Sequence, residues 1–274
     1  MKKKILITGI NGYIGQHLSK MLKDDYDVYG IDFVDEFTTN IQQGNIRYKH
    51  MPFMLHHHFD TIIHLAALVQ VGESVRMPWE YYDTNINGTH NVLNSFSYDN
   101  FVFASTGAAV NPVTPYGLSK RVAEDVVREH CKNRNKSSTI FRFYNVIGSE
   151  GFVPTNPDGL FYNLIKAEQN GKFYLYGDDY NTPDGSCIRD YVHVNEICHA
   201  LKTAIEIPSS QVENLGHGKG YSVKQMIRTY QQVNDCDFEV KVCPRREGDL
   251  ESSVLDNVSP YMVELYSFEE LMKK

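Results

Sequence analysis

The sequence predicts an α/β fold built on a doubly wound parallel sheet. Short apolar runs alternate with helical stretches through the first half of the chain, and a glycine-rich turn over residues 8–15 follows the first of these runs. Strands that alternate with helices indicate β-α-β units, whose strands lie parallel in one sheet. We therefore expect a parallel sheet with helices on both faces.

Strands and helices can be placed from the spacing of apolar residues in this first part. In the first helix Ile14, Leu18 and Leu22 recur at helical spacing and share one face. We expect strands at residues 4–8, 27–32, 61–67, 101–105 and 139–145, and helices at residues 13–22, 78–97 and 116–132.

The amino-acid composition of the chain changes from Ser149 onward. Residues 151–159 are rich in Pro, Asn and Gly and predict a loop. We expect residues 1–148 to form one domain and residues 149–274 a smaller α/β lobe, with residues 186–206 packing back on the first domain. Within the lobe we expect helices at residues 160–170, 194–205 and 223–234, and strands at residues 173–176 and 238–242.

Composition excludes several classes of protein. The net charge of −7 over 274 residues argues against a general nucleic-acid or anionic-membrane surface. No apolar run approaches transmembrane length, and the run after the N-terminal lysines ends at Thr8, too short for a signal peptide. The five cysteines form no CxxC pair. We expect a cytoplasmic protein with reduced thiols.

Histidines gather at His50 and in the run His56-His57-His58. A metal site needs ligands at matched positions, usually with carboxylates beside them. The run lies in a predicted loop without a paired carboxylate pattern, so we interpret these histidines as solvated and expect no metal.

The glycine-rich turn has the form of a dinucleotide site. Gly9, Gly12 and Gly15 allow a tight turn and a close approach of the backbone to a pyrophosphate, at the start of a helix whose N–H groups favour an anion. Asp32 ends the next strand, 17 residues after Gly15. A carboxylate there accepts hydrogen bonds from a ribose and repels a 2′-phosphate, so NAD is favoured over NADP.

A second motif, Tyr116-Gly117-Leu118-Ser119-Lys120, puts a phenol and an ammonium one helical turn apart. An ammonium beside the phenol stabilises the phenolate and lowers the pKa of the tyrosine, which makes it a usable base. Thr106, at the end of the preceding strand, supplies a hydroxyl. With a bound nicotinamide, these groups predict redox chemistry on a sugar-like alcohol; the structural alternative is an amphipathic surface helix.

Longer motifs connect these residues to a known family. The chain resembles the extended short-chain dehydrogenases/reductases and, among them, the UDP-glucose (UDP-galactose) 4-epimerases, over nearly its whole length. The resemblance implies a Rossmann-like NAD domain and a UDP-sugar lobe. Beside the glycine turn and the Tyr-Lys pair, it rests on residues 64–67, 71–74, 81–89, 176–180, 189–194, 214–216 and 244–249.

The resemblance implies a role for each site residue. Tyr116 is the general base and acid, Lys120 its partner and a ribose ligand, and Thr106 binds the sugar C4 hydroxyl. The implied cofactor residues are Gly9, Gly12, Tyr13, Ile14, Gly15, Asp32, Leu65, Ala66, Ala67, Asn85, Tyr116 and Lys120. The implied substrate residues are Thr106, Asn145, Leu160, Tyr176, Arg189, Arg246, Asp249 and Ser253. Arginines suit a diphosphate because the guanidinium donates two parallel hydrogen bonds.

The implied reaction is NAD-dependent 4-epimerisation of a UDP-hexose through a transient 4-keto sugar, in a homodimer that binds neither nucleic acid nor membrane. Two alternatives stay open: another sugar-nucleotide enzyme of the same fold, such as a dehydratase or decarboxylase, and a non-catalytic NAD-binding protein. A dehydratase needs an acid pair just after the threonine, and here Gly107 and Ala108 follow Thr106.

The chain departs from the family pattern in three places. Nine residues separate Thr106 from Tyr116, where relatives carry a longer loop, and the stretch from Asp32 to Thr61 is also short. The usual adenine-contacting element is missing there, so residues 51–53 are candidates to replace it. Ser253 falls at a position where a small residue accompanies N-acetylated substrates, although a surface serine is an equally good interpretation. Which UDP-sugar is physiological stays open.

Overall fold

The protein was analysed as a computed structural model, which describes residues 1–33, 40–48, 57–246 and 249–274. The chain divides into two compact units. The first comprises Met1–Phe143 and Cys198–Glu213, and the second comprises Tyr144–Ile197 and Asn214–Lys274. Of the segment 186–206, residues 198–206 thus fall in the first unit and residues 186–197 in the second.

A seven-stranded sheet organises the first unit. Its strand order is β10-β6-β5-β4-β1-β2-β3, and the strands from β6 to β3 pair in parallel. The order reverses direction between β1 and β4, the switch point at which doubly wound folds bind ligands. The strands span β1 Lys4–Thr8, β2 Asp27–Asp32, β3 Ile41–Gln43, β4 His58–His64, β5 Ser97–Thr106, β6 Ser137–Phe143 and β10 Val212–Leu215.

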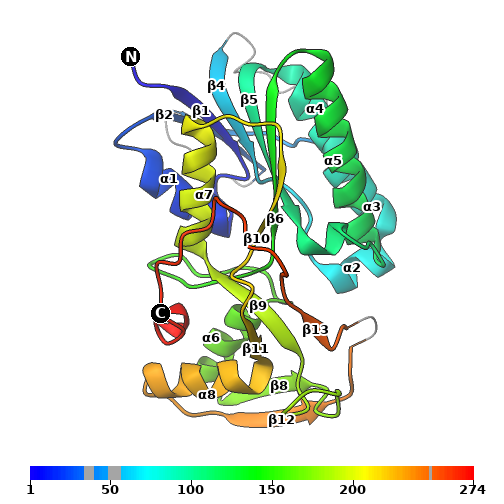
Figure 1. Ribbon diagram of the computed structural model, residues 1–274, viewed down its shortest axis with the longest axis vertical. Helices are drawn as coiled ribbons and strands as arrows, with labels where there is room; N and C mark the ends of the chain where they lie inside the picture. The colour runs from blue at the N-terminus through cyan, green and yellow to red at the C-terminus, as the bar shows by residue number, and fades with distance from the viewer. Residues whose placement is uncertain (34–39, 49–56, 247–248) are drawn as a thin grey trace. The chain divides into compact units, whose positions relative to one another are not determined.

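Helices cover both faces of this sheet (Figure 1). On one face lie α1 (Tyr13–Leu22) and the part of α7 (Val194–Glu206) that belongs to this unit; on the other lie α4 (Gly88–Ser95) and α5 (Pro115–Asn133). Fully buried side chains from β1, β4, β5 and β6 fill the core between these layers, among them Leu6, Ile62, Phe101 and Ile140. The predicted doubly wound α/β class is confirmed.

Several predicted boundaries are confirmed to the residue, namely those of β1, α1 and β2. The third predicted strand, 61–67, is wrong at both ends, because β4 begins at His58 and ends at His64. His58 and Phe59 pair with Ser97 and Tyr98 of β5, which extends both strands beyond their apolar runs. The Leu65 N–H still donates to the backbone carbonyl of Thr8. The next N–H, that of Ala66, donates to the Thr8 side chain instead, and the chain leaves the sheet there.

The single helix predicted over residues 78–97 is wrong. The segment forms α3 (Pro78–Tyr82), a π-helical stretch (Asp83–Asn87) and α4, and Ser97 already begins β5. Short π-helical stretches inside helices accommodate one extra residue and are frequent at functional sites. Here the stretch carries Asn85, whose buried side chain is bonded outside the helix.

The strand predicted over residues 139–145 is also wrong at its end. β6 stops at Phe143, and Asn145 begins a separate strand, β7 (Asn145–Ile147), in the second unit. The chain changes partners at Tyr144, whose N–H donates to the carbonyl of Leu215. β7 then pairs in parallel with β9 (Ile188–His193).

The second unit contains two small sheets. In the larger one, β9 pairs with β7, β11 (Gly220–Ser222) and β13 (Ser252–Ser253); in the other, β8 (Lys172–Tyr176) pairs in parallel with β12 (Glu239–Cys243). Among the described residues of this unit, α6 (Leu160–Asn170) and α8 (Val223–Val233) are the α-helices that lie wholly within it, and α8 begins with a capping box between Ser222 and Gln225. Phe161, Leu164, Tyr230 and Phe238 form part of its core. This unit has the α/β character predicted for the lobe.

Within the described residues, no helix has the length and apolarity needed to cross a membrane, and no three potential metal ligands gather. His58, from the histidine run, pairs with Asp99 on the surface. His50, His56 and residues 51–53 lie outside the described residues.

Candidate active site

The glycine turn lies at the carboxyl end of β1, next to the switch point of the sheet. Gly9 has a φ of +74°, a conformation that favours glycine, and its N–H donates to the carbonyl of Ile31 at the end of β2. Gly12 is the N-cap of α1, and Tyr13 and Ile14 begin that helix. The turn therefore presents a helix N-terminus at the edge where the parallel strands end.

Two of these glycines are required by the packing of the turn itself. A Cβ on Gly9 would come within 2.8 Å of the Ala66 nitrogen, and one on Gly15 within 2.3 Å of the Gly9 carbonyl oxygen. Gly12 is less constrained, since its Cβ would lie 3.1 Å from the Gly9 oxygen. Leu65, Ala66 and Ala67 are half-buried beside the turn. Because the glycines carry no side chains, a dinucleotide pyrophosphate can approach the backbone of this turn directly.

Asp32 ends β2 and is 7% exposed. One carboxylate oxygen accepts a hydrogen bond from the backbone N–H of Asn11 at 2.9 Å, and the other accepts from Phe33 at 2.8 Å. The carboxylate thus also holds the glycine turn to the end of β2. It stands at the position that the sequence predicts for a ribose contact.

Tyr116 and Lys120 lie in the first turns of α5, which begins at Pro115 behind the N-cap Thr114. The Thr106 side chain, at the end of β5, interacts with the Tyr116 phenol. Lys120 is 3% exposed, and its ammonium lies 4.3 Å from the centre of the Phe103 ring. The structure brings the three predicted catalytic side chains to one end of the sheet.

Burial dominates the acid–base properties of this site. It lowers the pKa of Lys120 to about 7, while the charge of Glu124 acts in the opposite direction. Burial raises the pKa of Tyr116, and its interaction with Thr106 acts against that rise. The Tyr-Lys spacing predicts a lowered pKa for Tyr116. With the protein groups alone this prediction is wrong, because desolvation of the phenolate raises the pKa of Tyr116 more than the neighbouring groups lower it.

The short connection between Thr106 and Tyr116 is held by local hydrogen bonds. The Thr106 hydroxyl accepts from the Ala108 N–H, and the Thr114 hydroxyl accepts from the Gly117 N–H, each at 3.3 Å. A Cβ on Gly117 would lie 2.7 Å from the Ala108 oxygen. The backbones of this connection and of α5 therefore approach closely, which fixes where Tyr116 starts the helix.

Asn85 is buried behind the catalytic pair. Its side chain exchanges hydrogen bonds with the N–H and the carbonyl of Leu68, at 2.9 and 3.0 Å. It also donates to the Ser119 hydroxyl, which in turn donates to the Tyr116 carbonyl at 2.7 Å. Asn85 thus joins the chain after β4 to the helix that carries Tyr116 and Lys120.

Sequence reasoning missed a buried cluster on the same helix. Glu124 is 1% exposed and accepts two hydrogen bonds from Arg142 and one from Ser105. The signal was present, because Glu124 follows Lys120 by four residues, the spacing that places two side chains on one helical face. Its partners are far away in the sequence and were not predictable from that spacing.

A second group of predicted residues meets inside the second unit. Arg189 of β9 donates to the carboxylate of Asp249 at 2.8 Å. Ser253 of β13 is paired in register with Arg189. This ion pair gives Arg189 a structural role, and it also places an arginine, an aspartate and Ser253 together.

The remaining predicted substrate residues of this unit lie on β7, β8, α6 and the connection that follows β12. The Arg246 guanidinium stacks on the Tyr176 ring at 4.1 Å, with Tyr176 38% exposed at the end of β8. The Asn145 amide donates to the carbonyl of Asp190, and Leu160 is the first residue of α6. An exposed tyrosine face with an arginine over it suits an aromatic base and a neighbouring phosphate.

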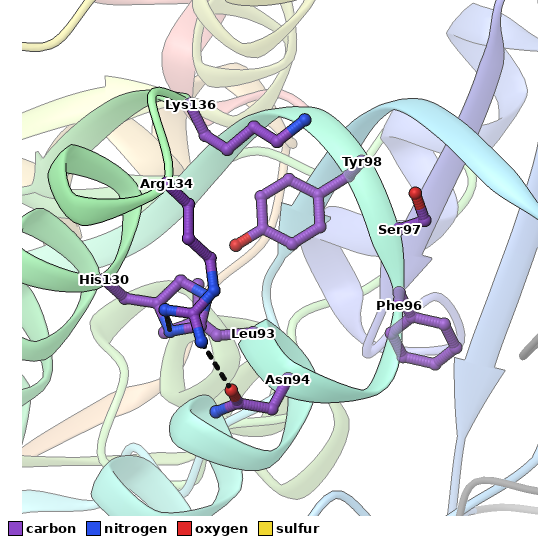
Figure 2. A pocket seen from close by; sticks show the side chains of 8 residues that line it. All are labelled: Leu93, Asn94, Phe96, Ser97, Tyr98, His130, Arg134 and Lys136. Carbon is purple, nitrogen blue, oxygen red and sulfur yellow. Dashed lines mark hydrogen bonds between the residues drawn. The ribbon is translucent and has the colours of Figure 1, made fainter.

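A cavity of about 350 Å³ in the first unit lies apart from all these residues (Figure 2). It is lined by the end of α4, the start of β5 and the end of α5, including Asn94, His130 and Arg134. Arg134 contacts the His130 ring and donates to the side-chain oxygen Oδ1 of Asn94, and Lys136 pairs with Asp99. The cavity is at the opposite end of β5 from Thr106, and none of the predicted site residues lines it.

Known proteins resemble this chain over most of its length. The model of the NAD dependent epimerase/dehydratase family matches residues 5–216. A UDP-glucose 4-epimerase of Lactobacillus helveticus is 31% identical over 293 residues, which cover 93% of this chain and 88% of that protein. The aligned length exceeds the 274 residues of this chain, so the relative carries residues that this chain lacks.

Solved structures give the same result. UDP-glucose-4-epimerase from Stenotrophomonas maltophila, with bound NAD and formylated UDP-arabinopyranose, has a TM-score of 0.82 at 27% identity, over 93% of this chain and 90% of that one. The UDP-Glc/GlcNAc 4-epimerase from Campylobacter jejuni has a TM-score of 0.77 at 29% identity, over 98% and 96%.

The fold and the Tyr-Lys-Thr site define an extended short-chain dehydrogenase/reductase. The chain belongs to the NAD dependent epimerase/dehydratase family, in the group that contains the UDP-glucose 4-epimerases.

Proposed function

We propose that this protein is an NAD-dependent 4-epimerase of UDP-hexoses. The observation that carries the proposal is that the Tyr116 phenol interacts with Thr106 at the end of β5, with the buried Lys120 one turn farther along α5. These are the groups needed to take a proton from a secondary alcohol and to return it. The relatives named above are epimerases of UDP-sugars.

NAD supplies a hydride acceptor that becomes the donor in the second half of the reaction. The surface at Gly9, Gly12 and the start of α1 holds its pyrophosphate in this proposal, and Asp32 accepts from its ribose. Leu65, Ala66 and Ala67 line the neighbouring part of the cofactor, Asn85 supports it, and Lys120 contacts a ribose. Because Asp32 repels a 2′-phosphate, NAD is preferred over NADP.

Tyr116 acts as the base in the first half of the reaction and as the acid in the second. Its phenolate takes the proton of the C4 hydroxyl while C4 loses hydride, which gives a 4-keto sugar. Thr106 holds the C4 oxygen, and the Lys120 ammonium stabilises the phenolate. Return of hydride to the other face of C4, with the proton from Tyr116, inverts that carbon. The raised pKa of Tyr116 means that the positive charges of Lys120 and of the oxidised nicotinamide must supply this activation.

The second unit holds the UDP part in this proposal. Arg189 and Arg246 bind the diphosphate, Asp249 the uridine ribose, and Tyr176 stacks on uracil, with Asn145 and Leu160 beside them. Binding energy from this non-reacting group positions the sugar. Support comes from the Arg189–Asp249 pair and the Tyr176–Arg246 stack, which gather these side chains in one unit.

We also infer that N-acetylated hexoses are accepted. Ser253 is a small residue in register with Arg189, and the structural relative from Campylobacter jejuni, 29% identical, is a UDP-Glc/GlcNAc 4-epimerase. A small side chain leaves space for an acetamido group where a bulky aromatic would fill it.

A homodimer and a cytoplasmic location complete the proposal. Val75 and Trp79 are 61% and 79% exposed on α2 (Val71–Arg76) and α3, and Leu118 of α5 is 43% exposed. Such apolar residues on neighbouring helices suit contact with a second copy. Light scattering after gel filtration tests this, and a monomer at all concentrations would contradict it.

Proton NMR of the protein with NAD and, separately, UDP-galactose and UDP-GalNAc tests the activity. Conversion to the gluco isomers is the expected result. Bound NAD without turnover of any sugar nucleotide would instead favour the non-catalytic alternative. Loss of the C6 oxygen would indicate a dehydratase, which the Gly107-Ala108 sequence after Thr106 argues against.

A further inference from the structure

Glu124 has no part in the proposed reaction, yet it is among the most completely bonded carboxylates of the protein. It accepts from Ser105 Oγ at 2.5 Å and from Arg142 Nε and Nη2 at 2.8 and 2.6 Å, and it is 1% exposed. A buried ion pair can often be replaced by apolar side chains without loss of stability, so burial by itself does not explain its presence. Its position one turn from Lys120 indicates a different role.

The surroundings of Lys120 contain one compensating negative charge. His64 of β4 lies close enough to interact with the ammonium, the Phe103 ring of β5 covers it, and Tyr116 is one turn away on α5. Of the described residues that act on Lys120, Glu124 is the one whose charge favours the ammonium. Since burial lowers the pKa of Lys120 to about 7, its charge at neutral pH depends on Glu124.

We propose that the Glu124–Arg142 pair is a positioning device that keeps Lys120 charged and, through Lys120, keeps Tyr116 active. This inference rests on the proposed function of Tyr116 and Lys120. Arg142 holds both carboxylate oxygens in a fixed, two-point geometry. Ser105 links the same carboxylate to the strand end that carries Thr106, so helix and strand are held together at the site.

A titration of Lys120 tests this coupling without reference to turnover. The ¹³Cε resonances of labelled lysines report the charge state, and the Lys120 signal is assigned by its absence in Lys120→Arg. In Glu124→Gln we expect the Lys120 midpoint to fall by about one pH unit, the size typical of a close opposite charge. Glu124→Asp keeps the charge and should restore the midpoint. Glu129→Gln makes the same charge change at an exposed site of α5 and should leave it unaltered.

Arg142 loses its ion pair with Glu124 in Glu124→Gln, which endangers folding. The double variant Glu124→Gln with Arg142→Met removes both charges and is expected to fold as well as the wild type. Its Lys120 midpoint should still be lowered, but by less than in Glu124→Gln, because the repulsion from Arg142 is removed together with the attraction of the carboxylate. Circular dichroism melts establish that the variants compared are folded.

Kinetics supply the second readout. In Glu124→Gln the alkaline limb of the kcat profile should move to lower pH, with kcat at pH 7 roughly fivefold lower, the loss of charged lysine for a one-unit shift. KM for the UDP-sugar should stay the same. An unchanged Lys120 midpoint in folded variants would overturn the inference. A lowered midpoint in a protein that turns over no UDP-sugar would support the coupling and count only against the proposed reaction.

Discussion

Asn85 and Ser119 are joined by a buried hydrogen bond of 2.9 Å that connects the π-helical stretch to α5. The Ser119 hydroxyl donates in turn to the backbone carbonyl of Tyr116. The Asn85 side chain also exchanges hydrogen bonds with the backbone of Leu68. The start of the catalytic helix is thus tied to the chain that follows β4. The placement of Tyr116 depends on a residue 31 positions earlier in the sequence.

Asn85→Ala should cost about 1–3 kcal/mol of stability, because it leaves the partly buried N–H and carbonyl of Leu68 without the Asn85 side chain and removes the buried bond to Ser119. Urea unfolding measures this change. Asn87→Ala, on the same π-helical stretch, removes an exposed hydrogen bond to Asp83 and should cost little. Equal losses in the two variants would contradict the role given to Asn85.

Tyr116→Phe should reduce kcat by about 10²–10⁴-fold, since it removes the acid–base group but keeps the ring. Thermal stability should change little. Turnover of UDP-galactose measures the effect, with Tyr174→Phe, 51% exposed on β8, as the matched control. Near-normal turnover of Tyr116→Phe would make the assignment wrong.

Gly12→Ala and Gly159→Ala form a matched pair. Both glycines are helix N-caps with extended backbone, and a Cβ on either would lie 3.1 Å from a carbonyl oxygen three residues earlier. The two substitutions should therefore change stability similarly, while only Gly12→Ala weakens NAD binding, by about tenfold or more if the pyrophosphate contacts this backbone. Calorimetric titration with NAD measures it; equal affinities would exclude Gly12 from the cofactor site.

His217 and the buried Glu196 predict a pH-dependent stability of the second unit. The hydrogen bond that His217 donates to Glu196 raises the pKa of His217 above its ordinary value. A group whose pKa is raised on folding stabilises the protein below its unfolded pKa, and this contribution is lost as the pH rises through the folded pKa. The free energy of unfolding should therefore fall from pH 6 toward alkaline pH.

His217→Ala should abolish this part of the pH dependence and cost about 1–3 kcal/mol at pH 6, because Glu196 keeps only its two backbone donors, His193 and Leu265. Urea unfolding at several pH values measures both effects. The exposed pair of His58 and Asp99 offers the control, and His58→Ala should change stability by less than about 1 kcal/mol. A His217→Ala protein with the wild-type pH dependence would refute the assignment.

Ser253→Tyr should reduce turnover of UDP-GalNAc by about tenfold or more relative to UDP-galactose, because an aromatic ring takes the space of an acetamido group. Ser252→Tyr, at the exposed neighbouring position of β13, should leave the ratio unchanged. Full N-acetyl activity in Ser253→Tyr would show that Ser253 does not set this preference.

Local patterns in the sequence determined a large part of this protein. The bounds of β1, α1 and β2, the glycine turn between them and the start of α6 follow from apolar spacing and turn residues that act within a few positions. The Tyr116–Lys120 spacing likewise follows from the helix itself. Such features are predictable because the interactions that form them are local.

Tertiary structure decided the rest. The π-helical stretch at Asn85 and the change of sheet at Tyr144 arise from hydrogen bonds with residues that are distant in the chain. The raised pKa of Tyr116 and the Glu124–Arg142 pair depend on burial that no local pattern encodes. Desolvation and the choice of a buried partner are properties of the packed interior, so they exist only once the sheet and its helices have come together.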